Sequence, residues 1–166
     1  MEEKPMYDYI LVVVDMQPHF VRNPRTIAAV KREVETARRN DLPIIVLEIP
    51  YHGPEPDKPY PPTYASIMKL IAGYDKAHVV HKLTAGGSMK LLRKCQAMGY
   101  QTSRYRVCGV KTDLCVLATV KGLLLRTRAS VEVVKAACDT LARYRRFCWA
   151  KYPVGKRLRL IEKEAV

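Results

Sequence analysis

Residues 9–15 read Tyr-Ile-Leu-Val-Val-Val-Asp. The part before Asp15 is an unbroken apolar run rich in β-branched side chains, which is typical of a strand covered on both faces of a sheet. The run ends abruptly at Asp15. Similar apolar runs follow at Pro43–Leu47, Ala77–His81, Tyr105–Cys108 and Val131–Val134.

The stretches between these runs are long enough to hold helices. Three of them carry apolar residues at helical spacing: Thr26–Arg39, Tyr64–Ile71 and Ser88–Met98. Alternation of strands and helices predicts an open α/β sheet of parallel strands with helices on both faces, in which ligands bind at the carboxyl ends of the strands. Candidate functional residues are therefore sought where the strands end.

The chain shows no sign of division into domains. It has 166 residues, the size of one domain, with no repeat, low-complexity tract or interdomain linker. Residues 50–62 hold six prolines, which remove backbone donors and exclude regular structure. We therefore expect one domain over residues 1–166 with a loop at 50–62, and leave open whether that loop is a lid.

Charge is distributed unevenly along the chain. The formal net charge is +13, and residues 81–120 and 121–166 contribute +6 and +8 of it. Such a field attracts anionic small molecules, acidic proteins or nucleic acid, but it also arises on a merely soluble surface. The charge alone does not choose among these.

The composition also restricts the compartment. The five cysteines include no C-x-x-C pair, so neither a disulfide framework nor a structural zinc site is expected. No apolar stretch is long enough to span a membrane, and the acidic start is unlike a secretion signal. We expect a cytoplasmic protein without a membrane partner.

Three chemically active side chains fall at the predicted sheet edge. Asp15 ends the first strand, Lys82 follows the third, and Cys115 lies at a helix entry after the fourth. Thr112 is placed as the N-cap, so Cys115 would occupy the anion position of a capping box. The helix dipole and Lys82 would then lower the pKa of the thiol, and Asp15 could act as general base.

Taken singly, each of these residues has an ordinary structural explanation. Asp15 could cap a turn, Lys82 could be a solvated charge, and Cys115 could be buried filler. Spacing alone gives only a weak hypothesis.

Three motifs strengthen that hypothesis through a family resemblance. They are D-x-Q-x-x-F at residues 15–20, His81-Lys82, and G-x-x-T-x-x-C-V at residues 109–116. In order and spacing they resemble the signatures of the isochorismatase-like cysteine hydrolases, whose relatives include nicotinamidases and N-carbamoylsarcosine amidases. The match runs from about Ile10 to Val134, which is most of the chain.

The resemblance implies both a fold and a mechanism. It implies strand order 3-2-1-4-5, with a sixth strand left open, and a catalytic triad of Asp15, Lys82 and Cys115. It also implies a cis peptide at Val110–Lys111, which lets the backbone N–H groups of Lys111 and Cys115 form an oxyanion hole. The cysteine favours cleavage of amide, carbamoyl or other C–N bonds of a small molecule and leaves open whether that molecule is anionic. The family resemblance also favours a dimer or larger homo-oligomer.

Metal ligands are incomplete by comparison with nicotinamidases, which carry an Asp-x-His and a second His after the second strand. The corresponding region reads Glu-Ile-Pro-Tyr-His at residues 48–52, so Pro50 replaces the aspartate and His52 remains. His78 and His81 are three residues apart on a strand and face opposite sides. We predict neither a catalytic metal nor a cofactor.

Substrate contacts are less well defined by the sequence than the triad. Gln17 and Phe20 follow the first strand, Tyr51 and His52 lie in the proline-rich loop, and Thr112 precedes the nucleophile. All five are candidates for lining the pocket, although loop aromatic residues more often pack locally.

A second hypothesis is a non-catalytic binding protein. Its basic second half, including Arg143-Tyr-Arg-Arg-Phe147, would engage nucleic acid or an acidic partner. The same string also fits a helix with Tyr144, Phe147 and Cys148 towards the core and arginines in water, within one or two helices over Arg143–Lys163. The helix is favoured, so nucleic acid is the less favoured partner.

Overall fold

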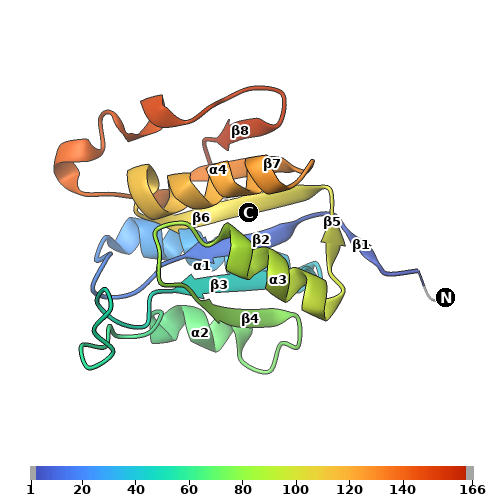
Figure 1. Cartoon of the computed structure of the whole chain (residues 1–166), viewed down its shortest axis with the longest axis horizontal. Coiled ribbons are helices and arrows are strands. Elements are labelled where there is room, and N and C mark those ends of the chain that lie inside the picture. The colour runs from blue at the N-terminus through green and yellow to red at the C-terminus, as the bar shows by residue number, and fades with distance from the viewer. Residues whose placement is uncertain (1–2, 164–166) are drawn as a thin grey trace.

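The main sheet has six strands, all parallel. The computed structural model describes residues 3–163. The strand order is β4-β3-β2-β6-β7-β8 (Figure 1), which confirms the predicted order and adds the sixth strand. The bounds are β2 Ile10–Val14, β3 Ile44–Glu48, β4 Ala77–His81, β6 Arg104–Val110, β7 Ser130–Asp139 and β8 Leu158–Ile161.

Helices cover both faces of this sheet, as predicted. The cluster formed with α1 (Pro24–Arg39) and α2 (Ala65–Ile71) includes Leu11 and Val13 of β2. The cluster formed with α3 (Ser88–Met98) and α4 (Leu117–Arg126) includes Ile10 and Val12. Alternate residues of β2 thus enter opposite layers, and this burial on both sides explains its continuous apolar run.

Two short strands form a second parallel sheet that the sequence did not reveal. They are β1 (Met6–Tyr7) and β5 (Gln101–Thr102). Each precedes a main-sheet strand, so the pair lies near the amino ends of β2 and β6 (Figure 1). This edge is opposite the one that holds the candidate catalytic residues.

The residues after β7 correct one expectation. In place of helices, the chain forms two 3-10 turns, η2 (Ala142–Tyr144) and η3 (Cys148–Lys151), and then the edge strand β8. Cys148 is buried as expected, but Tyr144 and Phe147 are 42% and 64% exposed. Tertiary bonds override the helical pattern here, because Arg145 pairs with Asp139 and the segment must return to the sheet edge.

Three composition-based expectations can be compared with the structure. In the described part of the chain, no helix is long and apolar enough to cross a membrane. All five cysteines are free, so there is no disulfide framework. The proline-rich loop contains only an isolated bridge between Tyr51 and Pro59, as its composition predicts.

Candidate active site

The three predicted catalytic residues meet at the carboxyl edge of the sheet. Asp15 follows β2 and Lys82 follows β4, while Cys115 lies in a π-helical turn, η1 (Thr112–Val116), after β6. The Lys82 ammonium is 2.9 Å from Asp15 Oδ2, and the Cys115 thiol is near enough to the same carboxylate for the two groups to shift each other's pKa. The topology therefore brings together residues that are 100 positions apart in the sequence.

Lys82 is buried, and its ammonium group is surrounded by acceptor oxygens of the protein. Only 1% of it is exposed, and its ammonium donates to the carbonyl oxygens of Thr84 and Ala85, both at 3.0 Å, in addition to pairing with Asp15. Three acceptors match the three donors of an ammonium group. Lys82 is thus held in one position as a fixed positive charge, and it is not the solvated lysine of the ordinary structural explanation.

Asp15 is equally buried but has spare capacity to accept a proton. Apart from Lys82 and the Cys115 thiol, the described residues offer its carboxylate no donor. Burial raises the pKa of Asp15 above its usual value, and Lys82 opposes that rise. A carboxylate with a raised pKa and free lone pairs is suited to take and return a proton.

The thiol of Cys115 differs from the sequence expectation. Burial, followed by the negative charge of Asp15, raises its pKa to about 11, while Lys82 and the Lys111 backbone N–H act in the opposite direction. The predicted lowering is therefore wrong, because the sequence argument counted the cation and helix end but not the burial or the adjacent carboxylate. Cys115 rests as a thiol beside a base.

The turn that carries Cys115 is not the predicted capping box. Thr112 makes no N-cap bond; Lys111 precedes the turn, and its carbonyl accepts from the N–H groups of Leu114 and Val116. The peptide bond Val110–Lys111 is cis, the geometry that the family resemblance implies. The Lys111 N–H lies against the Cys115 sulfur.

Thr119 is a residue of the site that the sequence analysis did not propose. It is fully buried and donates its hydroxyl to the Cys115 carbonyl at 2.8 Å, while it accepts from the Gly87 N–H at 3.1 Å. A side chain on Gly87 would collide with Leu47 and press on the Lys82 stem. One hydroxyl therefore ties the nucleophile turn to the loop that encloses Lys82.

Glu48 is a second buried carboxylate that was not proposed for the site. It ends β3 as Asp15 ends β2, which was the available sequence signal. It accepts from the Thr63 N–H at 2.6 Å, lies 3.4 Å from His81 Nε2, and contributes to the raised pKa of Asp15. Glu48 thus joins the proline-rich loop to the neighbourhood of the triad.

Gln17 corrects a predicted substrate contact. It is 1% exposed; its amide nitrogen donates to the carbonyls of Ile49 and Pro61, and its amide oxygen accepts from the Ile49 N–H. Both donors are consumed by main chain. The residue fastens the loop after β3 to β2 and is not open to a substrate.

Of the remaining candidates, the aromatic ones cluster beside the site. Phe20 and His19 pack on Tyr60, and His52 hydrogen-bonds to the Tyr60 hydroxyl. Tyr51 is half-buried in the same loop.

Thr112 is placed differently from the aromatic candidates. It is buried, and its carbonyl accepts from the Tyr152 hydroxyl at 2.6 Å. Thr112 therefore stabilises the turn through its main-chain carbonyl, and its side chain is not exposed to solvent.

Metal-ligating groups do not converge in the described part of the chain. It contains no set of three His, Cys, Asp or Glu side chains arranged to hold an ion. His52 is bonded to Tyr60, and His78 is bonded to the Tyr100 hydroxyl at 2.8 Å.

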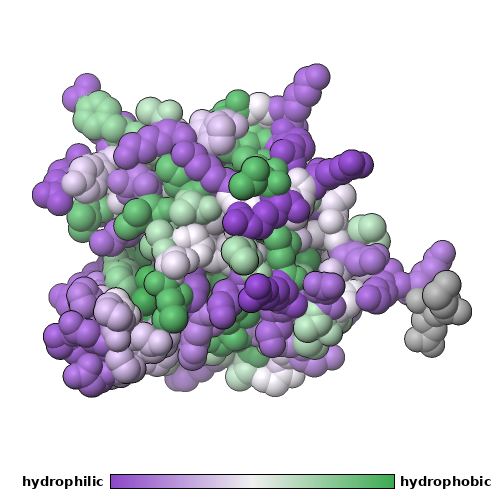
Figure 2. Space-filling model, in the orientation of Figure 1, coloured by the Kyte–Doolittle hydropathy of each residue, from purple (hydrophilic) through white to green (hydrophobic). Residues whose placement is uncertain are grey.

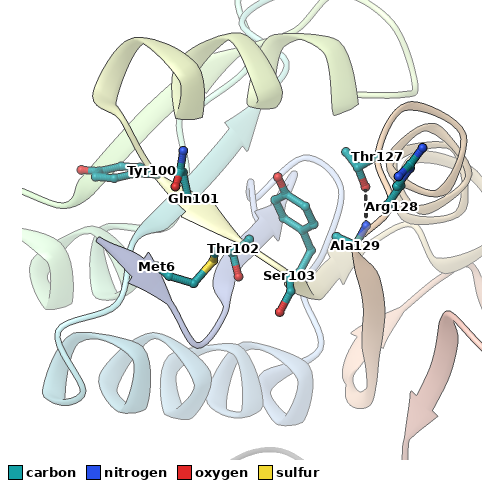
Figure 3. Close-up of a pocket in the computed structure, with 9 residues that line it drawn as sticks. Met6, Tyr100, Gln101, Thr102, Ser103, Thr127, Arg128 and Ala129 are labelled. Atoms are coloured by element: carbon teal, nitrogen blue, oxygen red, sulfur yellow. Dashed lines mark hydrogen bonds between the residues drawn. The ribbon is translucent and has the colours of Figure 1, made fainter. Parts of the chain in front are cut away.

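Two surface cavities lie at opposite edges of the sheet. One of about 520 Å³ is lined by residues of β5 and of the turn before β7, including Tyr100, Gln101 and Arg128 (Figure 3). It lies at the amino edge, away from the triad. Another of about 420 Å³ lies at the carboxyl edge, between the chain after β2 and the chain after β7, and Phe20, Val110 and Leu141 line it.

A parallel sheet covered by helices on both faces, with a thiol, a carboxylate and a buried lysine at its carboxyl edge, is the architecture of the protein. The family model described as the isochorismatase domain matches residues 9–150. The chain therefore belongs to the isochorismatase family of hydrolases.

Solved structures share the fold at low sequence identity. N-carbamoylsarcosine amidase from Thermoplasma acidophilum is 19% identical with a TM-score of 0.74, over 96% of this chain and 99% of that one. The nicotinamidase/pyrazinamidase PncA from Bacillus subtilis is 13% identical with a TM-score of 0.76, over 94% and 100%. The MAR1 ribonuclease from Caenorhabditis elegans is 20% identical with a TM-score of 0.70, over 86% and 71%.

A comparison with curated protein sequences found no match.

Proposed function

We propose that this protein is a metal-independent cysteine amidohydrolase that cleaves a C–N bond, amide or carbamoyl, in a small molecule. Cys115 is the nucleophile, Asp15 moves the proton, and Lys82 holds the carboxylate in place. One observation carries the proposal: the buried Asp15 carboxylate is 2.9 Å from the Lys82 ammonium and near enough to the Cys115 thiol to raise its pKa. Two of the structural neighbours, an N-carbamoylsarcosine amidase and a nicotinamidase, agree with this class of reaction.

The first half of the reaction forms a thioester. Asp15 takes the proton of the Cys115 thiol as the sulfur attacks the carbonyl carbon, and the C–S bond forms. The tetrahedral intermediate collapses with cleavage of the C–N bond, and Asp15 returns the proton to the leaving amine. Because the resting thiol has a raised pKa, transfer to Asp15 during attack replaces prior ionisation.

The second half restores the enzyme. Asp15 takes a proton from water, and the resulting hydroxide attacks the thioester and breaks the C–S bond. The departing sulfur recovers that proton, and the product is an acid. In both halves the backbone N–H groups of Lys111 and Cys115 would stabilise the oxyanion; the position of the Lys111 N–H against the sulfur supports this assignment.

A substrate screen with matched variants tests the proposal. Purified protein is treated with a chelator and incubated with a panel of small amides and carbamoyl compounds, and released ammonia is measured. We expect turnover of at least one compound, and losses of about a thousandfold or more in Cys115→Ala and Asp15→Asn. Cys95→Ala, which removes a buried thiol remote from the triad, should retain activity. Activity that survives in Cys115→Ala, or that disappears with the chelator, would refute the proposal.

A further inference from the structure

The segment at residues 141–151, here called the basic turn, is unusually charged for its position. Residues 140–161 contain seven arginines and lysines and no acidic residue. The basic turn spans η2 and η3 and lies at the same sheet edge as the triad (Figure 1). At the upper left of Figure 2, where this segment lies, hydrophilic and hydrophobic side chains are mixed on the surface.

Some of these arginines and lysines form ion pairs within the described residues, and others form none. Arg145 is paired with Asp139, and Arg159 is paired with Glu132. Within the described residues Arg143, Arg146 and Lys151 have no acidic partner, and all three are exposed. These three cations are therefore available to an anion.

Aromatic rings are interleaved with the available cations. Tyr144 is 42% exposed and Phe147 is 64% exposed. The Arg143 guanidinium lies 4.7 Å from the Tyr144 ring centre, and that of Arg146 lies 5.6 Å from the Phe147 ring centre. The rings and cations thus form one exposed surface in which aromatic faces and positive charges alternate.

The residues that flank the basic turn are hydrogen-bonded to η1, the turn that carries Cys115. Thr140 donates to the Asp113 carboxylate at 2.5 Å, and the buried Tyr152 hydroxyl donates to the Thr112 carbonyl. The exposed groups of the basic turn are therefore presented by a fixed support beside Cys115.

We propose that the basic turn binds single-stranded nucleic acid, with phosphates on Arg143, Arg146 and Lys151 and bases stacked on Tyr144 and Phe147. Stacking on exposed rings next to cations is how single strands are held without sequence readout. A duplex hides its bases from such rings. An acidic peptide would use the charges but not the rings, and two 3-10 turns are too short to lie in a membrane as an amphipathic helix. The inference does not depend on the hydrolase proposal.

Fluorescence anisotropy of the full chain with a labelled 20-nucleotide single-stranded RNA of mixed sequence tests the surface. The charge variant is Arg143→Glu/Arg146→Glu, and the ring variant is Tyr144→Ala/Phe147→Ala. The matched control is Lys90→Glu/Arg93→Glu, which makes the same charge change at exposed positions of α3. Circular dichroism establishes that each variant is folded.

We expect wild-type binding that weakens steeply between 50 and 200 mM salt, roughly tenfold or more. The charge variant should bind about tenfold more weakly, the ring variant about fivefold or more, and the control within about twofold. Trp149, the only tryptophan, lies in the basic turn, so its fluorescence should change on titration in wild type. Cys115→Ser should bind RNA as wild type does, which separates this inference from the catalytic proposal.

Four results would overturn the inference: no binding at 50 mM salt, equal weakening of the control variant, unaltered binding by the ring variant, or equal affinity for a duplex of the same length. The last three would reduce the effect to general attraction of a basic protein for polyanions. An acidic peptide or anionic vesicle that displaces the RNA through the ring residues would also contradict it.

Discussion

At the scale of single residues, the chemistry depends on where one proton lies. Burial raises the pKa of both Asp15 and Cys115. In the resting state the thiol therefore keeps its proton, and the carboxylate is available to accept that proton. The Lys82 ammonium is bound by three oxygen atoms. It opposes a further rise of the Asp15 pKa and holds the carboxylate in place. This arrangement protects the thiol from adventitious electrophiles until a substrate is positioned.

Thr119 tests the coupling between the nucleophile turn and the lysine loop. Thr119→Val removes the hydroxyl and with it two buried hydrogen bonds, one to the Cys115 carbonyl and one from the Gly87 N–H. We expect a loss of about 2–4 kcal/mol in the free energy of unfolding, measured with urea. Thr119→Ser keeps both bonds and should lose only about 1 kcal/mol. Equal losses in the two variants would show that packing, and not the hydroxyl, matters.

The triad was accessible from the sequence because strand ends and motif spacing fix which residues share an edge. The pKa of the Cys115 thiol could not be predicted in this way. It depends on burial and on the distance to Asp15, and the spacing of residues in the sequence specifies neither. Gln17 was misassigned for a related reason: its main-chain partners, Ile49 and Pro61, come from a loop without periodicity.

At the scale of elements, β6 must come very close to β2 before it delivers the nucleophile turn. Gly109 has a φ of +122°, and an added Cβ would overlap the carbonyl of Val14. We expect Gly109→Ala to lower the free energy of unfolding by more than about 3 kcal/mol. Gly53→Ala, at a φ of +53° in open space, should cost about 1 kcal/mol. Thermal melts of the two variants compare them, and similar midpoints would contradict the close approach.

An ion cluster joins β8 to the sheet. Glu132 of β7 pairs with Arg104 and Arg106 of β6 and with Arg159 of β8. Burial alone would raise the pKa of Glu132, but the three arginines outweigh it and lower the pKa below its usual value. Because the folded pKa is lowered, the stabilisation is present above the unfolded value and is lost as pH falls through the folded value.

Glu132→Gln should therefore destabilise the protein by roughly 2–4 kcal/mol at pH 7. The difference from wild type should shrink as pH falls below the ordinary value of 4.5. Urea unfolding of wild type and variant measures the difference in the free energy of unfolding at pH 7 and at pH 3. A difference that is unchanged or larger at pH 3 would contradict the assigned direction of the pKa.

Elements with a strong apolar period were predictable, and those shaped by tertiary bonds were not. The helix expected at Ser88–Met98 has those bounds in the structure. The string from Arg143 to Phe147 also has helical spacing, yet Arg145 is drawn to Asp139 and the chain turns back to add β8. The small sheet of β1 and β5 has two residues per strand, too few for any period to show.

At the scale of the whole molecule, the two edges of the sheet differ in role. The carboxyl edge holds the triad, the aromatic cluster and the basic turn. The amino edge holds the small sheet (Figure 1) and a cavity that no triad residue lines (Figure 3). The excess charge of the second half is concentrated partly beside the candidate active site. A single domain over residues 1–166 and a cytoplasmic location stay predictions.

Homo-oligomerisation also stays a prediction, and the surface offers a place for it. Leu125 of α4 is 79% exposed, Met89 of α3 is 50% exposed, and Leu83 is 61% exposed. We expect light scattering after size-exclusion chromatography to give at least twice the 18.9 kDa of one chain. Leu125→Glu should shift the population towards the monomer, while Lys121→Glu, an exposed polar change on the same helix, should not. A wild-type mass of one chain would contradict this expectation.

The central claim, that Asp15 controls the Cys115 thiol, is tested most directly by the pH dependence of Cys115 alkylation with iodoacetamide. Peptide mass spectrometry follows wild type and Asp15→Asn, with the buried Cys108 as an internal report of unfolding. In wild type, alkylation should be slow at neutral pH and rise towards a midpoint near the thiol pKa of about 11. In Asp15→Asn the carboxylate is gone and Lys82 acts unopposed, so the midpoint should fall. A wild-type midpoint below pH 8, or an unchanged or higher midpoint in Asp15→Asn, would contradict the account.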